Sequence, residues 1–242
     1  MSIRAVTFDF WGTLFREVPE AGAQRMRRRA RALADATGAS LADAERVLEE
    51  TAHEFARVHM EEQRTLTPLD AVRLATDALS VLLSGTAANE LSALFACVIL
   101  DHPPVPIEGA LEAVRAAAAR GPVGVISDTG ISPGSSLRVL LEREGFLPHL
   151  KCASFSDEVG VAKPQAPMFT RTANALGVTP HELFHLGDLE FSDIAGIHAQ
   201  GGRAGLFAGV NDRYLTETKA DYTFLSWQEF IEKIDQLIDR GM

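Results

Sequence analysis

In the second half of the chain, short apolar runs alternate with longer stretches in which apolar residues recur at helical spacing. The runs of strand length are residues 122–127, 152–155, 183–187, 203–207 and 221–224. The helical stretches cover about 108–120, 134–144, 166–176, 190–200 and 226–239. Strands separated by helices pair in parallel, and helices then cover both faces of the sheet. The pattern therefore predicts an α/β fold around a parallel sheet.

A further strand near the N-terminus leads directly to a carboxylate. Apolar and β-branched residues run from Ala5 to Phe8, and Asp9, Gly12 and Thr13 follow them. A buried strand that ends in a polar turn places Asp9 at the carboxyl edge of the sheet, where open parallel sheets bind ligands. Asp9 is therefore a candidate nucleophile or metal ligand, and the alternative is a turn-forming aspartate.

Residues 16 to about 100 have a different pattern, which is helical throughout and contains few glycines. The predicted helices cover 21–37, 41–63, about 67–83 and about 87–98. Three prolines between Asp101 and Pro106 then indicate an extended linker. The sequence predicts an all-helical domain, residues 16–103, inserted into an α/β core domain formed by residues 1–15 and 104–242.

Composition narrows the range of partners. The 242 residues carry a formal net charge of −10 at pH 7, which argues against nucleic acid as the main ligand because phosphate backbones select basic surfaces. No apolar stretch approaches the length of a membrane span, and the N-terminus lacks a signal-peptide pattern. We expect a cytoplasmic protein with no membrane partner and with Cys97 and Cys152 as reduced thiols. Monomer and homodimer both remain open.

One basic cluster stands out in this acidic chain. It consists of Arg25, Arg27, Arg28, Arg29 and Arg31. Residues at this spacing cover much of the circumference of a helix and cannot all face one ligand. We expect a solvated face rather than a dedicated anion site, from which one or two arginines could reach a substrate.

Polar residues occur at four places where predicted strands end. They are Asp9 with Thr13, Ser127 with Asp128 and Thr129, Lys163, and Asp188 with Asp193. In this order, and with the spacing Asp9-x-x-Gly12-Thr13-Leu14 and Gly187-Asp188-x-x-x-x-Asp193, they resemble the four motifs of the haloacid dehalogenase-like hydrolase superfamily. The resemblance covers essentially the whole chain. It includes the helical insertion, which is similar to the C1-type cap that this superfamily places over a Rossmann-like core.

The resemblance implies Mg²⁺-dependent hydrolysis of a small phosphorylated metabolite through an aspartyl-phosphate on Asp9. The implied metal ligands are Asp9, the backbone carbonyl of Trp11 and Asp188, with Asp193 either holding a metal-bound water or orienting Lys163. Ser127 and Lys163 would stabilise the transferring phosphoryl group. The implied substrate-binding residues, some through backbone amides, are Phe10, Thr13, Asp128 and Thr129.

Trp11 departs from the superfamily pattern. Phosphatases of the superfamily usually carry an aspartate at this position, which protonates the leaving alcohol and then activates water. A well-placed acid or base is worth about 10²–10⁴ in rate, and an indole cannot protonate an alkoxide. We therefore expect a slow or specialised phosphatase, for instance one whose substrate is an acyl phosphate with a good leaving group.

Two alternatives stay open. Dehalogenases of the superfamily have an aromatic residue at the position of Trp11, because their aspartate attacks carbon and halide leaves without a proton. They lack the pattern of Asp188 and Asp193, which this chain keeps. Because of the aromatic residue at Trp11, the first alternative is a metal-independent 2-haloacid dehalogenase. The second is a catalytically attenuated protein that binds a phosphorylated ligand.

Another residue could replace the missing acid. The candidates from the helical insertion are Glu17, His53 and His59, but we expect Glu17 to be a loop charge and the two histidines to be ordinary helix-surface residues. His185 lies within a predicted strand and is expected to be a packed core residue. His198 is expected on a helix.

Overall fold

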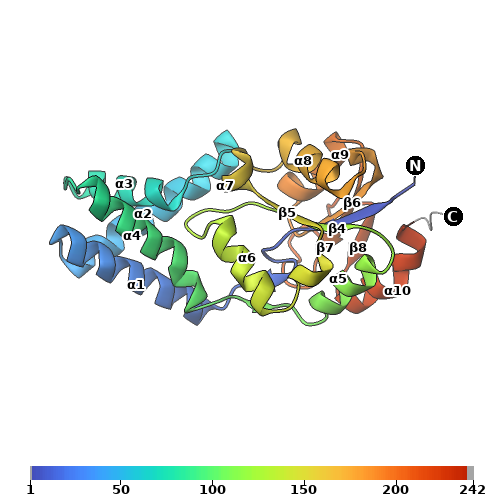
Figure 1. Cartoon of the computed structure of the whole chain (residues 1–242), viewed down its shortest axis with the longest axis horizontal. Helices are drawn as coiled ribbons and strands as arrows, with labels where there is room; N and C mark the ends of the chain where they lie inside the picture. Colours follow the sequence, from blue (N-terminus) through green and yellow to red (C-terminus); the bar gives the residue numbers. More distant parts are fainter. Residues whose placement is uncertain (1, 239–242) are drawn as a thin grey trace.

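The computed structural model describes residues 2–238. At its centre is a six-stranded sheet in the order β5-β4-β1-β6-β7-β8, in which every neighbouring pair is parallel (Figure 1). The strands are β1 Ala5–Phe8, β4 Val123–Ser127, β5 Cys152–Phe155, β6 Leu183–Gly187, β7 Arg203–Phe207 and β8 Tyr222–Phe224. The first strand therefore lies inside the sheet, next to β4 and β6.

Helices cover both faces of this sheet, as its apolar runs predict. Side chains alternate along β1, so that Val6 and Phe8 belong to one core and Ala5 belongs to the other. The helices packed on the first face are α5 Ala110–Ala118, α6 Gly134–Arg143 and α10 Trp227–Leu237. The helices on the second face are α8 Ala166–Leu176 and α9 Ala195–Ala199. The core is thus a three-layered, Rossmann-like α/β unit.

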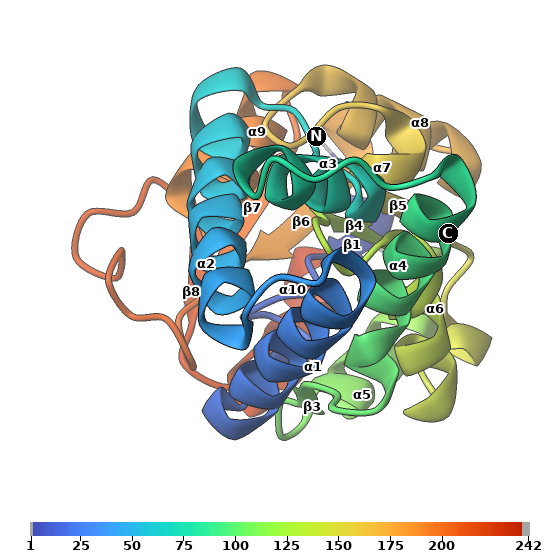
Figure 2. The same ribbon diagram turned by 90° about the vertical axis from the view of Figure 1, so that its left-hand side faces the viewer.

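Four helices form a separate bundle at one end of the molecule (Figure 1). They are α1 Pro19–Thr37, α2 Leu41–Arg57, α3 Pro68–Ala78 and α4 Gly85–Cys97. Their inward residues, such as Leu33, Val47 and Phe95, make a core of their own. Seen from that end, the bundle lies in front of the sheet (Figure 2). The predicted fold class, a Rossmann-like sheet with an inserted helical cap, is confirmed, while the domain boundaries stay a prediction.

The two segments that join the bundle to the α/β core pair with each other. Phe15–Arg16 (β2) and Val105–Pro106 (β3) form a short antiparallel ladder. The proline-rich linker is therefore extended at its end, as predicted. The partner strand was not predicted, because the two segments lie far apart in the sequence and neither shows a local signal for pairing.

Two arginines of the basic cluster are buried, so the prediction of a solvated face is wrong for them. Arg25 pairs with Glu17 and donates to the carbonyl of His102 at 2.6 Å. Arg29 donates to the carbonyl of Phe95 at 2.9 Å, and burial lowers the pKa of Arg29 to about 10. These bonds tie α1 to the segments that follow α4 and to α4 itself. Glu17 is a loop charge, as predicted, and it pairs with Arg25.

Most predicted elements are confirmed, and the differences occur at their ends. Strands 152–155, 183–187 and 203–207 have the predicted bounds. The helix predicted for 67–83 ends at Ala78, where Ser80 adopts a positive φ of 56°. The helix predicted for 41–63 continues past Arg57 as a wider π-type turn, Val58–Glu62. The predicted end of the last helix, residue 239, and the predicted core-domain residues 239–242 lie outside the described residues.

Short elements complete the described chain. They are the helix α7 Ser156–Val159, the π-type turn Glu190–Ile194, and the 3₁₀ turns Val98–Leu100, Leu147–His149 and Pro180–Glu182. Of the helices in residues 2–238, none combines the length and the apolar character needed to cross a membrane.

Candidate functional site

The carboxyl ends of three adjacent central strands meet below the helical bundle. Asp9 follows β1, Ser127 ends β4, and Asp188 follows β6, so parallel pairing alone brings them to one edge. A cleft of about 230 Å³ opens there. It is lined by Asp9, Trp11, Gly12, His59, Asp128, Lys163, Asp188, Leu189 and Ser192.

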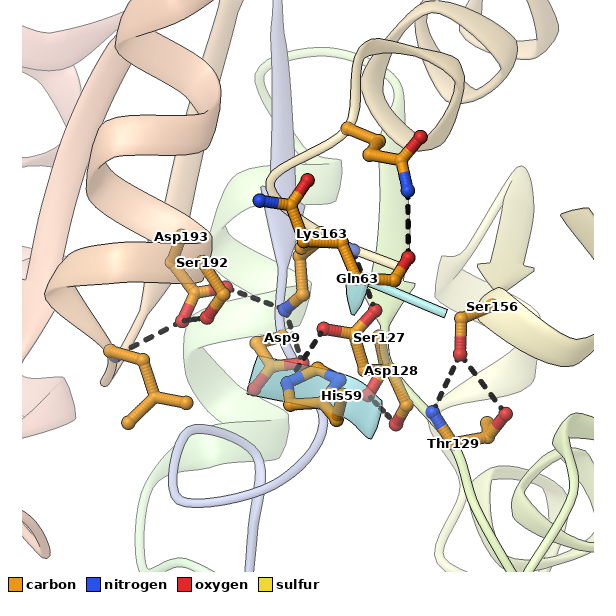
Figure 3. Close-up of polar contacts among 12 residues, drawn as sticks. Asp9, His59, Gln63, Ser127, Asp128, Thr129, Ser156, Lys163, Ser192 and Asp193 are labelled. Carbon is orange, nitrogen blue, oxygen red and sulfur yellow. Dashed lines mark hydrogen bonds and ion pairs between the residues drawn. The ribbon is translucent and has the colours of Figure 1, made fainter. Parts of the chain in front are cut away.

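Lys163 lies at the centre of this site. Its Nζ donates to Asp9 Oδ1 at 2.9 Å, to Asp193 Oδ1 at 2.5 Å and to the carbonyl of Ile126 at 3.2 Å (Figure 3). Burial alone would lower the pKa of Lys163, but the Asp193 and Asp9 carboxylates outweigh burial and hold that pKa above its usual range. Lys163 is therefore a fixed cation beside Asp9.

Asp193 is held from several sides. Besides Lys163, its Oδ1 lies 3.1 Å from Nε2 of His185, and its Oδ2 accepts from the backbone N–H of Leu189 at 3.0 Å. The other ring nitrogen of His185 lies 2.9 Å from the hydroxyl of Thr7. Burial favours the neutral acid, but Lys163 and His185 outweigh it, so the pKa of Asp193 lies well below its usual range. The prediction that His185 is a packed core residue is confirmed, and its contact with Asp193 orients the carboxylate that holds Lys163.

The carboxylates of Asp9, Asp188 and Asp193 crowd together. One oxygen from each lies within 4.8 Å of the others. Burial raises the pKa of Asp9 to about 6 although Lys163 opposes the shift. Burial, and then repulsion from Asp193 and Asp9, raise the pKa of Asp188 to about 7. Within residues 2–238, Lys163 is the only lysine or arginine that lines the cleft. The cluster thus carries more negative charge than one ammonium offsets, and this oxygen-rich set fits a divalent cation such as Mg²⁺.

Two glycines allow the carboxylates to approach the backbone this closely. Gly12 has a φ of 67°, and a Cβ there would lie 2.6 Å from Asp188 Oδ2. A Cβ on Gly187 would lie 2.1 Å from Cγ of Asp193. Any larger residue at either position would displace a carboxylate, so both motif glycines have a steric reason.

Several residues predicted to bind substrate have side chains outside the cleft. The ring of Phe10 stacks on Phe15 at 4.3 Å in the core. Thr13 is buried, and its hydroxyl has no hydrogen-bond partner among residues 2–238. Thr129 Oγ1 donates to Asp157 at 2.7 Å, and its backbone N–H donates to Ser156 Oγ at 2.8 Å. None of these three side chains lines the cleft, so they form the structure behind its walls.

The other predicted residues lie at the cleft or directly behind it. Trp11 lines the cleft and packs edge-on against Phe10 at 5.0 Å. Ser127 is buried, and its hydroxyl donates to the carbonyl of Asp128 at 3.2 Å. Asp128 itself lines the cleft. Burial raises the pKa of Asp128 to about 6, against the opposing effect of Lys163.

His59 corrects one expectation. It lies on the turn Val58–Glu62 and lines the cleft, with Nε2 3.8 Å from Asp128 Oδ2 (Figure 3). The prediction of an ordinary helix-surface residue is therefore wrong for His59, because the surface it occupies faces the core domain. His53, one helical segment earlier, is exposed as predicted.

The bundle is fastened to the loop that carries Lys163. Gln63, in a left-handed conformation with φ 51°, ends the turn that holds His59. Its carbonyl accepts from the backbone N–H of Ala162 at 3.1 Å and from Nε2 of Gln165 at 2.7 Å (Figure 3). This junction fixes His59 above the site.

Asn211 is a further site residue that the sequence did not predict. Its Nδ2 donates to Asp188 Oδ2 at 2.9 Å and lies 3.3 Å from the carbonyl oxygen of Asp188. Asn211 follows β7, so a polar residue after another parallel strand was the available signal. Its amide holds Asp188 toward the cleft.

Known proteins share this architecture. The family model for the haloacid dehalogenase-like hydrolases matches residues 3–201. No curated protein matches the sequence. Among solved structures, a haloacid dehalogenase-type phosphatase from Thermococcus onnurineus is 20% identical with a TM-score of 0.70, covering 99% of this chain and 100% of its own.

Two other solved structures differ in the chemistry attached to them. A magnesium-bound structure of the hydrolase YfnB from Bacillus subtilis is 16% identical, with a TM-score of 0.67 and coverage of 97% of this chain and 100% of that one. A 2-haloacid dehalogenase from Pseudomonas syringae pv. tomato is 20% identical, with a TM-score of 0.68 and coverage of 97% and 99%. At these identities the similarity is one of fold.

Proposed function

The chain belongs to the haloacid dehalogenase-like hydrolases, and from that premise we propose that it hydrolyses a small phosphorylated metabolite through an aspartyl-phosphate on Asp9, with Mg²⁺ as its cofactor. The observation that carries the proposal is the carboxylate cluster. Asp9, Asp188 and Asp193 offer oxygens within 4.8 Å of one another, beside one lysine. A reaction without a metal would leave this negative charge uncompensated where an anionic substrate must bind.

The residues suit an attack on phosphorus. Asp9 is the nucleophile, and the ammonium of Lys163, 2.9 Å from its Oδ1, offsets charge on Asp9 and on a phosphoryl oxygen. The hydroxyl of Ser127 and the backbone amides near Phe10 and Asp128 supply further donors. Asp193 and His185 act through Lys163 by fixing its position.

Asp9, the carbonyl of Trp11 and Asp188 are the groups that would hold Mg²⁺, and Asn211 orients Asp188. When bound, the ion offsets the repulsion between the Asp9 carboxylate and the phosphoryl oxygens. Oδ1 of Asp193 already accepts a hydrogen bond from Lys163 and contacts Nε2 of His185. These contacts support an indirect role for Asp193 at the metal site.

The size and lining of the cleft restrict the substrate. About 230 Å³ is less than the volume of pockets for drug-sized ligands, so the organic part must be small. Among the described residues that line the cleft, none is arginine, and Lys163 is already committed to two carboxylates. Among the described lining residues, a substrate with a second anionic group therefore meets no further lysine or arginine.

The same lining weighs against the dehalogenase alternative, which is favoured by the aromatic residue at Trp11. A 2-haloacid carries a carboxylate that needs its own cationic partner. Metal-independent attack would also have to proceed beside Asp188 and Asp193 without compensation. We therefore rank phosphoryl hydrolysis first.

Three substrates test the proposal. Acetyl phosphate and p-nitrophenyl phosphate should be hydrolysed with Mg²⁺, and turnover should disappear with chelator or with Asp9→Asn. Asp77→Asn, an exposed aspartate on α3, is the matched control and should leave the rates unchanged. Chelator-resistant halide release from 2-chloropropionate would establish the dehalogenase alternative instead. Stabilisation by phosphate without any Asp9-dependent turnover would indicate a binding protein.

A further inference from the structure

We propose that His59, paired with Asp128, is the proton-transfer residue that replaces the acid missing at Trp11. The inference rests on the proposed phosphoryl hydrolysis and adds to it the group that protonates the leaving oxygen and later activates water. It assigns a catalytic role to the helical bundle, so that the site is complete only when the bundle lies over the sheet.

The first support is position. The side chain of His59 comes from the helical bundle and lines the same cleft as Asp9 and Lys163 (Figure 3). A leaving group points away from the nucleophile in an in-line displacement, and we infer that it points toward the bundle, where His59 lies. The side chain keeps 25% of its exposure, which leaves it accessible to a bound ligand or water.

The second support is the partner carboxylate. Asp128 Oδ1 accepts from the backbone N–H of Lys163 at 2.9 Å, which fixes the carboxylate. Its other oxygen, Oδ2, lies 3.8 Å from Nε2 of His59. This is ion-pair distance, longer than a hydrogen bond. Small movements of the ring can then shift it between Asp128 and a substrate oxygen, and apo distances of this kind shorten when a ligand binds.

The third support is that the backbone segment that carries His59 is held in place. It lies on the π-type turn Val58–Glu62, a form of helix often found at functional sites. The Gln63 carbonyl that follows takes two hydrogen bonds, from Ala162 and Gln165. The loop that carries Lys163 therefore also fixes the position of His59 relative to the site.

The other candidate acids are unsuitable. Glu17 is paired with Arg25, and His53 is exposed and does not line the cleft. Within residues 2–238, His59 is the only histidine of the cleft lining.

The charges around His59 act in opposite directions. Burial and the Lys163 ammonium lower the pKa of His59, while Asp9 and Asp193 oppose that effect, and Asp128 is the nearest carboxylate. A phosphoryl dianion adds negative charge to the cleft and so favours the protonated ring. Substrate binding thus prepares His59 to donate.

The proton balance closes over one cycle. An Asp9 oxygen bonds to phosphorus as the bond from phosphorus to the leaving oxygen breaks, and the imidazolium N–H of His59 gives its proton to that oxygen, releasing the alcohol. Water then bonds to phosphorus, neutral His59 takes the water proton, and the bond from phosphorus to Asp9 breaks. The products are alcohol and inorganic phosphate, with Asp9 free and His59 protonated again.

A leaving-group series tests this role. We would measure kcat/KM for ethyl phosphate, phenyl phosphate and p-nitrophenyl phosphate with wild type, His59→Gln and the matched control His53→Gln. A general acid matters most for the poorest leaving group, so His59→Gln should lose about 100-fold with ethyl phosphate and less than about threefold with p-nitrophenyl phosphate. His53→Gln should keep the wild-type kcat/KM for both substrates. Retained p-nitrophenyl phosphate hydrolysis shows that the variant is folded.

Two further readouts separate catalysis from structure. The high-pH decline of kcat/KM for ethyl phosphate should disappear in His59→Gln, and adding Trp11→Asp to that variant should restore much of the lost rate. Equal losses across the series, or no loss with ethyl phosphate, would overturn the role of His59 and leave Asp9-dependent hydrolysis standing. If neither these esters nor acetyl phosphate shows Asp9-dependent hydrolysis, the proposed function fails and this inference fails with it.

Discussion

Replacing Asp188 by asparagine tests whether the carboxylate cluster is built for a cation. The variant removes one buried charge and keeps the shape of the side chain. The amide oxygen of the new residue can still accept from Asn211, which donates to Asp188 Oδ2 at 2.9 Å. We therefore expect Asp188→Asn to be more stable than wild type without Mg²⁺, although it loses a proposed metal ligand.

The size of the effect follows from the raised pKa of Asp188. Burial, Asp193 and Asp9 raise the pKa of Asp188 from 3.8 to about 7, and a shift of that size corresponds to about 4 kcal/mol. Below pH 3.8 the acid is neutral in both states and nothing is lost. Between that pH and about 7, the unfolded chain has released a proton that the folded protein keeps, so folding stability falls as pH rises. Above about pH 7 the full cost is present.

The assay is thermal unfolding in chelator at pH 8 and pH 5, repeated with Mg²⁺. At pH 8 without metal, Asp188→Asn should gain about 2–4 kcal/mol, or at least about 4 °C in Tm, and at pH 5 the gain should fall by more than half. Mg²⁺ should stabilise wild type and do little for the variant. The control Asp77→Asn should match wild type throughout. A variant less stable than wild type at pH 8 in chelator, or one that keeps the full Mg²⁺ response, would refute the reasoning.

Three more substitutions probe the site. Trp11→Asp should change kcat/KM for ethyl phosphate less than about threefold while His59 is present, and should raise it by about 100-fold in the His59→Gln background; a rise of about 100-fold with His59 intact would mean that His59 does not supply the proton. Lys163→Met removes the ammonium that pairs with the buried carboxylates of Asp9 and Asp193 and should abolish acetyl phosphate turnover and cost about 3–5 kcal/mol in urea unfolding; wild-type stability would contradict the charge balance described above. Gly187→Ala places a Cβ 2.1 Å from Cγ of Asp193 and should lower both Tm and turnover, whereas Gly85→Ala, with nothing within 4 Å, should lower neither.

The α/β core could be predicted because its signals are local. Apolar runs of strand length are buried on both faces of a parallel sheet, so strands 152–155, 183–187 and 203–207 are confirmed with their predicted bounds. Helix ends were predicted less accurately: the helix predicted to reach residue 83 ends at Ala78. The short ladder between β2 and β3 carried no signal, because pairing of segments far apart in sequence depends on what lies between them.

For the site, the strand pattern was enough to predict which groups gather at the sheet edge. Once Asp9, Ser127 and Asp188 follow strands of one parallel sheet, strand pairing brings them together, and this needs no knowledge of packing. The prediction that Lys163 lies at the end of a strand is wrong, because it lies in the loop after α7, and only its motif indicated a place in the site.

How the bundle meets that edge could not be predicted in this way and follows from contacts between distant segments. Placing His59 beside Asp128 depends on the π-type turn after α2 and on the two hydrogen bonds to Gln63, neither of which leaves a pattern in the sequence. The same holds for Arg25 and Arg29, which look like surface charges on a helical wheel and are buried against neighbouring backbone carbonyls. These positions could not be predicted because periodicity shows only which face of a helix is apolar. The partner of the polar face depends on contacts between segments that are distant in the sequence.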